Sequence, residues 1–81
     1  MRLIFTDEFK HDIRKIKDLG CQVKIKKVIQ KIMHNPDTGK QLKYELTGLL
    51  SIRLVKSRLI YEVRNDTIIL HKFEHRKSVY K

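Results

Sequence analysis

The residues best suited to chemistry in this 81-residue sequence lie near its carboxyl end. Residues 74–80 read Glu-His-Arg-Lys-Ser-Val-Tyr, which places an imidazole, a guanidinium, an ammonium and a phenol close together. Cleavage of RNA through its own 2′-hydroxyl uses a base, an acid for the leaving 5′-oxygen and cations around the phosphorane. We therefore interpret His75, Arg76 and Tyr80 as candidate catalytic residues and Lys77 as a candidate RNA contact.

The sequence contains little that would build a metal site or a nucleophilic triad. Its four histidines lack the HExxH spacing, and Cys21 is its single cysteine, so no thiolate pair is available for zinc. No GxSxG turn supports a serine nucleophile. We expect neither a metal nor another cofactor, because a chain of this length has no room for a separate cofactor domain.

A strong excess of positive charge points to a polyanionic partner. The chain carries 19 lysines and arginines against 9 aspartates and glutamates, a formal net charge of +10. Residues 1–35 hold nine basic and four acidic side chains, and residues 36–81 hold ten and five, so each part contributes +5. Such a surface attracts polyanions, of which nucleic acid is the commonest. A ribosome, an acidic protein, or a solvated basic surface without a ligand are the alternatives.

Length and composition indicate one small cytoplasmic domain over residues 1–81. A hydrophobic content of 41% suffices for one compact core. The single cysteine suits a reducing cytosol. No apolar run approaches the roughly 20 residues that a membrane span needs, and the amino terminus becomes acidic too soon for a secretory signal. We expect no association with a membrane.

The spacing of apolar residues predicts an α+β fold. A period near 3.6 marks two helices, the first ended by Gly20 and the second by Asn35-Pro36, and after residue 50 the period changes to two. Residues 40–48 remain ambiguous. An antiparallel helical hairpin would pack on one face of a small, mainly antiparallel sheet. The predicted order is βααβββ, over residues 2–6, 7–19, 22–34, 50–55, 58–64 and 67–74.

Two arginines are predicted to share the face of the sheet that the helices leave open. A two-residue loop at Lys56–Ser57 pairs Arg53 with Ile60. In this register Arg53 and Arg58 point away from the helices. A slip by one residue would bury them, so the pattern favours this register. Planar guanidiniums suit phosphate oxygens, so both arginines are candidate catalytic residues. Lys56, in the loop between them, is a candidate RNA contact.

Three further side chains receive a structural interpretation. Tyr61 lies on the predicted core face and is interpreted as a core residue. Tyr44 is interpreted as an ordinary half-buried tyrosine, with base stacking as the alternative. His71 is interpreted as a histidine that is partly buried or at the sheet surface rather than a catalyst.

An ordered set of segments resembles the RelE/ParE toxin superfamily, and its RelE branch most. The segments are Leu42–Leu49, Ser51–Leu54, Ser57–Val63 and His75–Tyr80, which follow a helical hairpin. The resemblance implies a βααβββ fold. It also implies a toxin that enters the ribosomal A site, cleaves the mRNA there without a metal, and is neutralised by a cognate antitoxin.

The resemblance also implies roles for individual residues. Arg58 matches the arginine that holds the scissile phosphate, and Arg76 the one that stabilises the transition state or leaving group. Tyr80 matches a tyrosine implicated in proton transfer. Arg53 and Lys43 match basic positions on and before the preceding strand.

The sequence departs from the resembling family at one position that concerns the base. Ser51 stands where some RelE toxins carry a lysine assigned to general-base work, and a serine cannot take that role at neutral pH. His75, where several members carry a histidine, or Tyr80 would then have to act as the base, or the enzyme would be slow.

Two other functions remain open beside mRNA cleavage. ParE-like members share the fold but inhibit DNA gyrase by binding it, without cutting RNA. A basic module that binds rRNA or the antitoxin and has lost activity is the third reading, with Ser51 as its trace.

Overall fold

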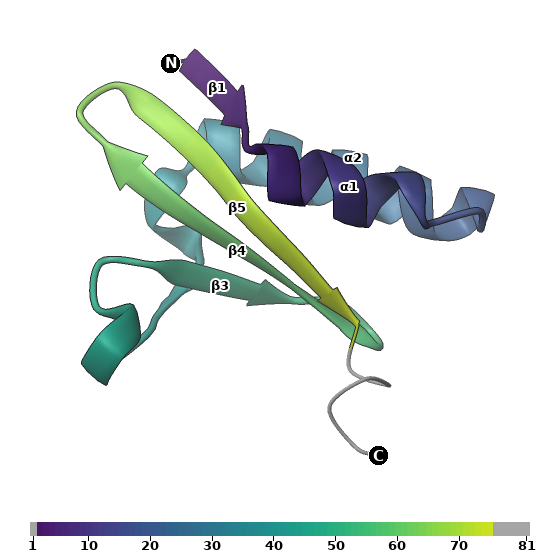
Figure 1. Ribbon diagram of the computed structural model, residues 1–81. Coiled ribbons are helices and arrows are strands. Elements are labelled where there is room, and N and C mark those ends of the chain that lie inside the picture. Colours follow the sequence, from purple (N-terminus) through teal and green to yellow (C-terminus); the bar gives the residue numbers. More distant parts are fainter. Residues whose placement is uncertain (1, 76–81) are drawn as a thin grey trace.

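The computed structural model describes residues 2–75, with side chains described as far as Glu74 (Figure 1). The predicted order of two helices and four main strands is confirmed. The structure adds a short 3-10 turn, η1, directly after the second helix. In the segment that the sequence left ambiguous it adds a two-residue strand, β2, and a second 3-10 turn, η2. The elements are β1 Arg2–Phe5, α1 Asp7–Arg14, α2 Leu19–His34, η1 Pro36–Thr38, β2 Lys40–Gln41, η2 Tyr44–Leu46, β3 Leu50–Arg53, β4 Ser57–Arg64 and β5 Thr67–His75.

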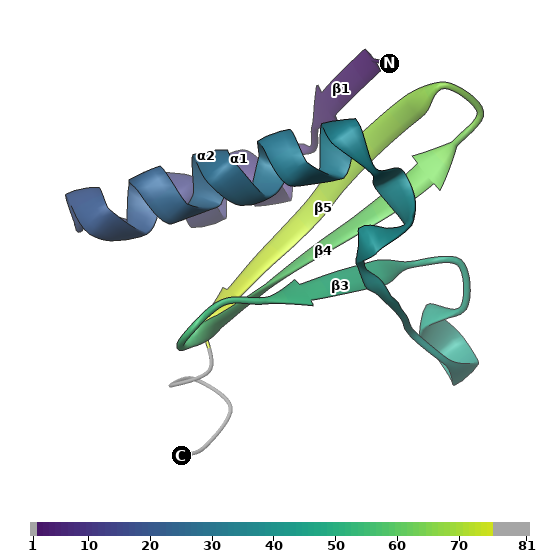
Figure 2. The same ribbon diagram turned by 180° about the vertical axis from the view of Figure 1, so that it is seen from behind.

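The strands form one five-stranded sheet in the order β1-β5-β4-β3-β2. β1 runs parallel to β5, and every other neighbouring pair is antiparallel. The helices α1 and α2 run antiparallel to each other, and Figures 1 and 2 show them from opposite sides of the molecule. Because the buried side chains of both helices meet one face of β4 and β5, the other face of the sheet is free to carry charge.

The first helix is shorter than predicted. Thr6 caps α1, since its hydroxyl accepts a hydrogen bond from the Phe9 N–H at 3.1 Å. The same hydroxyl lies 2.9 Å from the Leu70 carbonyl on β5, so the cap also ties the helix to the sheet. The helix ends at Arg14, although its apolar stripe predicted an end at residue 19.

The prediction that Gly20 ends the first helix is wrong. Gly20 lies in the first turn of α2, which begins at Leu19 rather than at residue 22. Asp18 is the N-cap, and its carboxylate accepts hydrogen bonds from the N–H groups of Gly20 at 2.8 Å and Cys21 at 3.4 Å. An aspartate that satisfies these N–H groups starts a helix where the glycine alone suggested an end.

The β3–β4 hairpin differs from the predicted register by two residues. The loop is Val55–Lys56, and the Leu54 N–H donates to the Ser57 carbonyl at 2.8 Å. Arg53 therefore pairs directly with Arg58, not with Ile60. A shift by two residues leaves the same alternate side chains on the core face, so the period-two pattern could not distinguish these registers.

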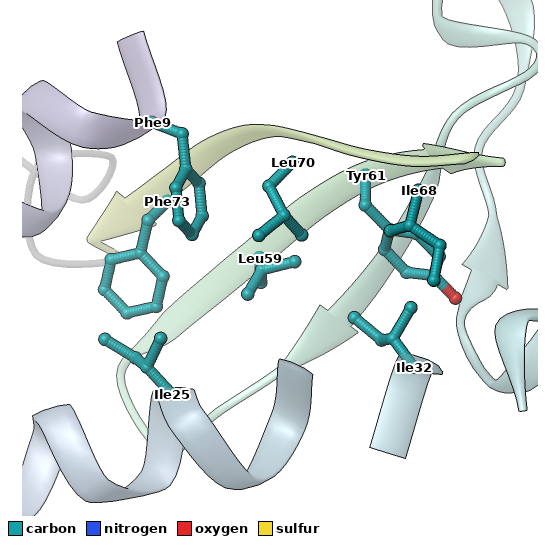
Figure 3. Packing of buried hydrophobic residues seen from close by; sticks show 8 residues of the cluster. All are labelled: Phe9, Ile25, Ile32, Leu59, Tyr61, Ile68, Leu70 and Phe73. Atoms are coloured by element: carbon teal, nitrogen blue, oxygen red, sulfur yellow. The ribbon is translucent and has the colours of Figure 1, made fainter. Parts of the chain in front are cut away.

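The core lies between the helices and the sheet (Figure 3). Tyr61 is fully buried, as predicted, and its hydroxyl donates to the Pro36 carbonyl at 2.8 Å and accepts from the Gly39 N–H at 2.9 Å. A Cβ on Gly39 would come within 2.6 Å of that hydroxyl oxygen, so this position requires glycine. The core cluster comprises Phe9, Ile25, Ile32, Leu59, Tyr61, Ile68, Leu70 and Phe73.

None of the helices within residues 2–75 is long and apolar enough to span a membrane.

Candidate functional site

A row of three charged residues crosses the open face of the sheet. Arg53 on β3 pairs with Arg58 on β4, and Arg58 pairs with Glu74 on β5. The Arg53 residue is exposed, and the Arg58 side chain is 41% exposed. Like charges opposite each other on neighbouring strands destabilise a sheet, and the Glu74 carboxylate offsets part of that repulsion. The structure thus brings together the two sheet arginines that the sequence predicted to share a face.

The contact between Arg58 and Glu74 uses only one oxygen of the carboxylate. Arg58 Nε donates to Glu74 Oε1 at 3.2 Å, and Arg58 Nη2 donates to the same atom at 2.7 Å. Glu74 was not among the predicted site residues. A two-residue Asn65–Asp66 turn by itself would place Phe73 opposite Arg58, and only the one-residue shift of register between Ile60 and Tyr61 brings Glu74 there.

The next row of paired strand residues contains Ser51, and its neighbours determine its role. Ser51 lies between Lys40 on β2 and Ile60 on β4 and is 8% exposed. Ile60 is 3% exposed, although it faces away from the core cluster. A small hydroxyl between these neighbours cannot act as a base at neutral pH, so Ser51 is a packing residue of the sheet.

A second charged cluster occupies the other end of β4. Glu62 Oε2 accepts two hydrogen bonds from Arg64, at 3.0 and 2.8 Å, and Oε1 lies 2.8 Å from His71 Nε2. A carboxylate only accepts, so His71 Nε2 carries the proton. The hydrogen bond with His71, assisted by the bond and charge of Arg64, holds the pKa of Glu62 below its usual value although desolvation opposes it.

His71 reaches Glu62 because of a bulge in β5. Ile60 pairs with Lys72 but Tyr61 pairs with Leu70, which makes His71 an extra residue on its strand. Its side chain is 33% exposed. The prediction of a partly buried histidine at the sheet surface is confirmed, and its partner was not foreseen.

The predicted RNA-contact lysines lie at different ends of the hairpin. Lys56 is exposed in the β3–β4 turn, next to the row of charged residues. Lys43 is exposed just before η2, which lies at the opposite end of β3 from Arg53 (Figure 1). The structure therefore does not bring Lys43 to the arginines.

Tyr44 corrects one expectation. It is 90% exposed rather than half-buried, and its φ of 60° lies in the left-handed region. The Thr47 hydroxyl donates to its carbonyl at 2.6 Å, which holds this unusual backbone in an ordered loop. The ring consequently points away from the core.

The remaining predicted residues lie at the edge of the described chain. The backbone of His75 ends β5, where it pairs with Ser57. Arg76, Lys77 and Tyr80 lie outside the described residues. Among residues 2–75, no group of three or more histidine, cysteine, aspartate or glutamate side chains is arranged to hold a metal ion.

Comparison with known proteins gives the family. Residues 3–80 match the model of the ParE toxin of the type II toxin–antitoxin system parDE. The chain belongs to this toxin family. The resemblance to the RelE/ParE superfamily is thereby confirmed. No curated protein sequence is a significant match.

Solved structures confirm a RelE-like fold for the toxin. The RelBE2 toxin–antitoxin complex from Mycobacterium tuberculosis gives a TM-score of 0.80 at 24% identity, covering 93% of this chain and 96% of that one. The YoeB dimer from Staphylococcus aureus gives 0.78 at 25%, covering 93% and 95%. The RelB–RelE complex from Methanococcus jannaschii gives 0.72 at 25%, covering 95% and 94%.

The toxin also has an open groove of about 710 Å³ beside the row of charged residues. It lies between the start of α2, the β3–β4 turn and the end of β5, and Glu74 is part of its wall. Five lysines and four carboxylates line it, so its charge is nearly balanced. These are Lys15, Lys17, Lys24, Lys56, Lys72, Glu8, Asp12, Asp18 and Glu74.

Proposed function

We propose that this toxin is a ribosome-dependent mRNA endonuclease that cleaves by attack of the RNA 2′-hydroxyl on the adjacent phosphate. The observation that carries the proposal is the pairing of Arg53 with Arg58 on the open face of the sheet. Two guanidiniums on adjacent strands present several N–H donors to the oxygens of one phosphate. Membership in the toxin family and the RelE-like fold support the same reading.

In the proposed reaction the arginines stabilise charge that develops on the phosphate. Arg58 holds the scissile phosphate, and Arg53 adds a second positive charge beside it. Arg76 supports the transition state or leaving group, and Tyr80 moves a proton, as the resemblance to RelE toxins implies. The products are a 2′,3′-cyclic phosphate and a 5′-hydroxyl. This reaction needs positioned acids, bases and cations and does not need a metal.

The proposed partners are a translating ribosome and a cognate antitoxin. The ribosome would present mRNA in its A site, and the basic surface of the toxin would hold it against RNA. Two of the similar structures are toxin–antitoxin complexes, which supports an antitoxin for this chain as well. A net charge of +10 favours an acidic partner, whose association should slow as salt is raised.

Controlled expression followed by mapping of RNA 5′-ends tests the proposed function. We expect new 5′-ends within translated codons soon after induction. A reporter mRNA that lacks its translation start site is the matched control and should remain intact. Equal cleavage of both reporters would contradict dependence on the ribosome, and intact transcripts during growth arrest would contradict RNA cleavage altogether.

Inhibition of DNA gyrase is the second candidate function. The observation that favours it is the family model itself, which is that of the ParE toxin. A supercoiling assay with purified gyrase separates the two candidates. Loss of supercoiling without any RNA cleavage would favour the gyrase reading.

A further inference from the structure

Within residues 2–75, the contact between Arg58 and Glu74 leaves hydrogen-bonding groups of both side chains without a partner. Both hydrogen bonds from Arg58 end on Oε1 of Glu74, and among residues 2–75 no partner donates to Oε2. Arg58 uses two of the five N–H donors that a guanidinium has, so others remain for a phosphate. The side chains are 41% and 32% exposed, which allows a ligand to reach them.

A base for 2′-hydroxyl attack must lie beside the group that holds the phosphate. The 2′-oxygen and the phosphorus that it attacks belong to the same nucleotide step, where C2′, C3′ and the 3′-oxygen connect them. A phosphate bound by Arg58 would therefore bring a 2′-hydroxyl close to the Glu74 carboxylate, which is already fixed by the same guanidinium. Hydrogen-bond reach to the proton is the first requirement of a general base.

The other described groups near the arginines are less suited to this task. Ser51 is a nearly buried hydroxyl between strands. Glu62 has a partner on each oxygen and lies near the opposite end of β4. Glu74 is thus the carboxylate in residues 2–75 that combines contact with Arg58 and an available oxygen.

We propose that Glu74 is the general base of the cleavage reaction, which rests on the proposed function. Oε2 of Glu74 takes the proton from the 2′-hydroxyl. The 2′-oxygen forms a bond to phosphorus, the bond from phosphorus to the 5′-oxygen breaks, and the leaving 5′-oxygen takes a proton from water or from an acid of the chain. Arg58 has two roles in this step: it positions the base and it binds the phosphate.

A negative charge beside a phosphate opposes binding, which gives the proposal a distinctive signature. Glutamine in place of Glu74 removes the repulsion but cannot accept the proton. Cleavage should therefore slow while binding stays the same or becomes tighter, whereas the loss of a residue with a purely structural role would weaken both.

Single-turnover cleavage of mRNA on programmed ribosomes tests this assignment with the full toxin chain. We expect Glu74→Gln to slow cleavage by roughly 100-fold or more, the usual contribution of a general base. Binding to ribosomes whose mRNA carries a 2′-deoxynucleotide at the scissile position should be unchanged or tighter. Glu62→Gln is the matched control, because it also replaces a glutamate bonded to an arginine, and it should cleave within about threefold of wild type.

Cleavage by Glu74→Gln as fast as wild type, or faster, would overturn the proposal, and a faster rate would show that Glu74 restrains Arg58. Absence of cleavage by the wild-type toxin would instead contradict the proposed function. Thermal unfolding confirms that each variant is folded. If Glu74→Gln does not fold, the pair Glu74→Asp and Glu74→Asn replaces it. The aspartate variant should then cleave faster than the asparagine variant, and equal rates would overturn the proposal.

Discussion

The two ends of β4 carry arginine–glutamate contacts that differ in how completely they are satisfied. Near the β3–β4 turn, Arg58 bonds one oxygen of Glu74, and Arg53 stands opposite Arg58 without a carboxylate partner among the described residues. Near the β4–β5 turn, Glu62 has one oxygen on Arg64 and the other on His71. The difference is between a contact that leaves hydrogen-bonding groups available and one that uses them.

This difference separates a site for chemistry from a support for the sheet. A fully bonded carboxylate is held in one position and has little left to offer a ligand. Within residues 2–75, the partly bonded pair has an oxygen and N–H groups without partners, at the place where two positive charges lie opposite each other. We therefore expect substitutions near the β3–β4 turn to affect RNA cleavage, and substitutions near the β4–β5 turn to affect folding stability.

The largest expected effect is the loss of cleavage when Arg58 is replaced. Arg58→Ala should lower the cleavage rate about 100- to 1,000-fold, by analogy with removal of an oxyanion donor, about 3–4 kcal/mol. Arg64→Ala is the matched control from the same strand and should retain the rate within about threefold. Single-turnover cleavage on programmed ribosomes measures both. Similar losses of cleavage rate in the two folded variants would contradict the assignment of catalysis to one end of β4.

An intermediate effect is expected on stability when Glu62 is replaced. Glu62→Gln removes a charge that accepts from two partners and should lower the unfolding free energy by about 1 kcal/mol at neutral pH. The Glu74 side chain is more exposed and has one partner among the described residues, so Glu74→Gln should cost less than about 0.5 kcal/mol. Urea unfolding compares the two. If Glu74→Gln lowered the unfolding free energy more than Glu62→Gln, the Glu74 contact would be the one that stabilises the sheet.

The same comparison has a pH dependence with a defined sign. The pKa of Glu62 is lowered in the folded state from an ordinary value of 4.5, so the folded protein binds this proton less readily than the unfolded chain. The stability from Glu62 is therefore fully present above about pH 4.5 and is lost as the pH falls through the lowered pKa. In that acidic range the unfolding free energy of the Glu62→Gln variant should depend less on pH than that of wild type.

The smallest expected effect concerns His71, the main cause of the lowered pKa of Glu62. His71→Leu should cost about 0.5 kcal/mol at neutral pH, because one partly exposed hydrogen bond to a carboxylate is lost. The difference from wild type should narrow once Glu62 is protonated. Urea unfolding at neutral and acidic pH measures this, and a constant difference would show that His71 acts through packing in the bulge instead.

Much of the fold could be predicted because periodicity records which side chains face the core. The alternation around Tyr61 placed that ring inside and put Arg53 and Arg58 on the opposite face, as the structure shows. The boundary between the helices could not be predicted from periodicity, because Asp18 caps α2 through local hydrogen bonds. The position of the β3–β4 turn was also undetermined, since registers two residues apart bury the same side chains.

Only the basic residues of the candidate site could be predicted from the sequence. A guanidinium on a strand implies a possible phosphate contact, and this reasoning found both sheet arginines. It did not find Glu74, because a glutamate at the end of a strand resembles any solvated charge until its cross-strand partner is known. It also did not find the partner of His71, which depends on one extra residue in β5.

The sequence by itself determined the order of the two helices and the four main strands, the charge of the toxin and the face on which its sheet arginines lie. These features follow from local spacing and composition, which each segment carries with it. Only the tertiary structure decided that Arg53 meets Arg58, that Glu74 lies beside them and that Glu62 has two partners. Those contacts join strands through register and a bulge, and register depends on how the whole sheet assembles.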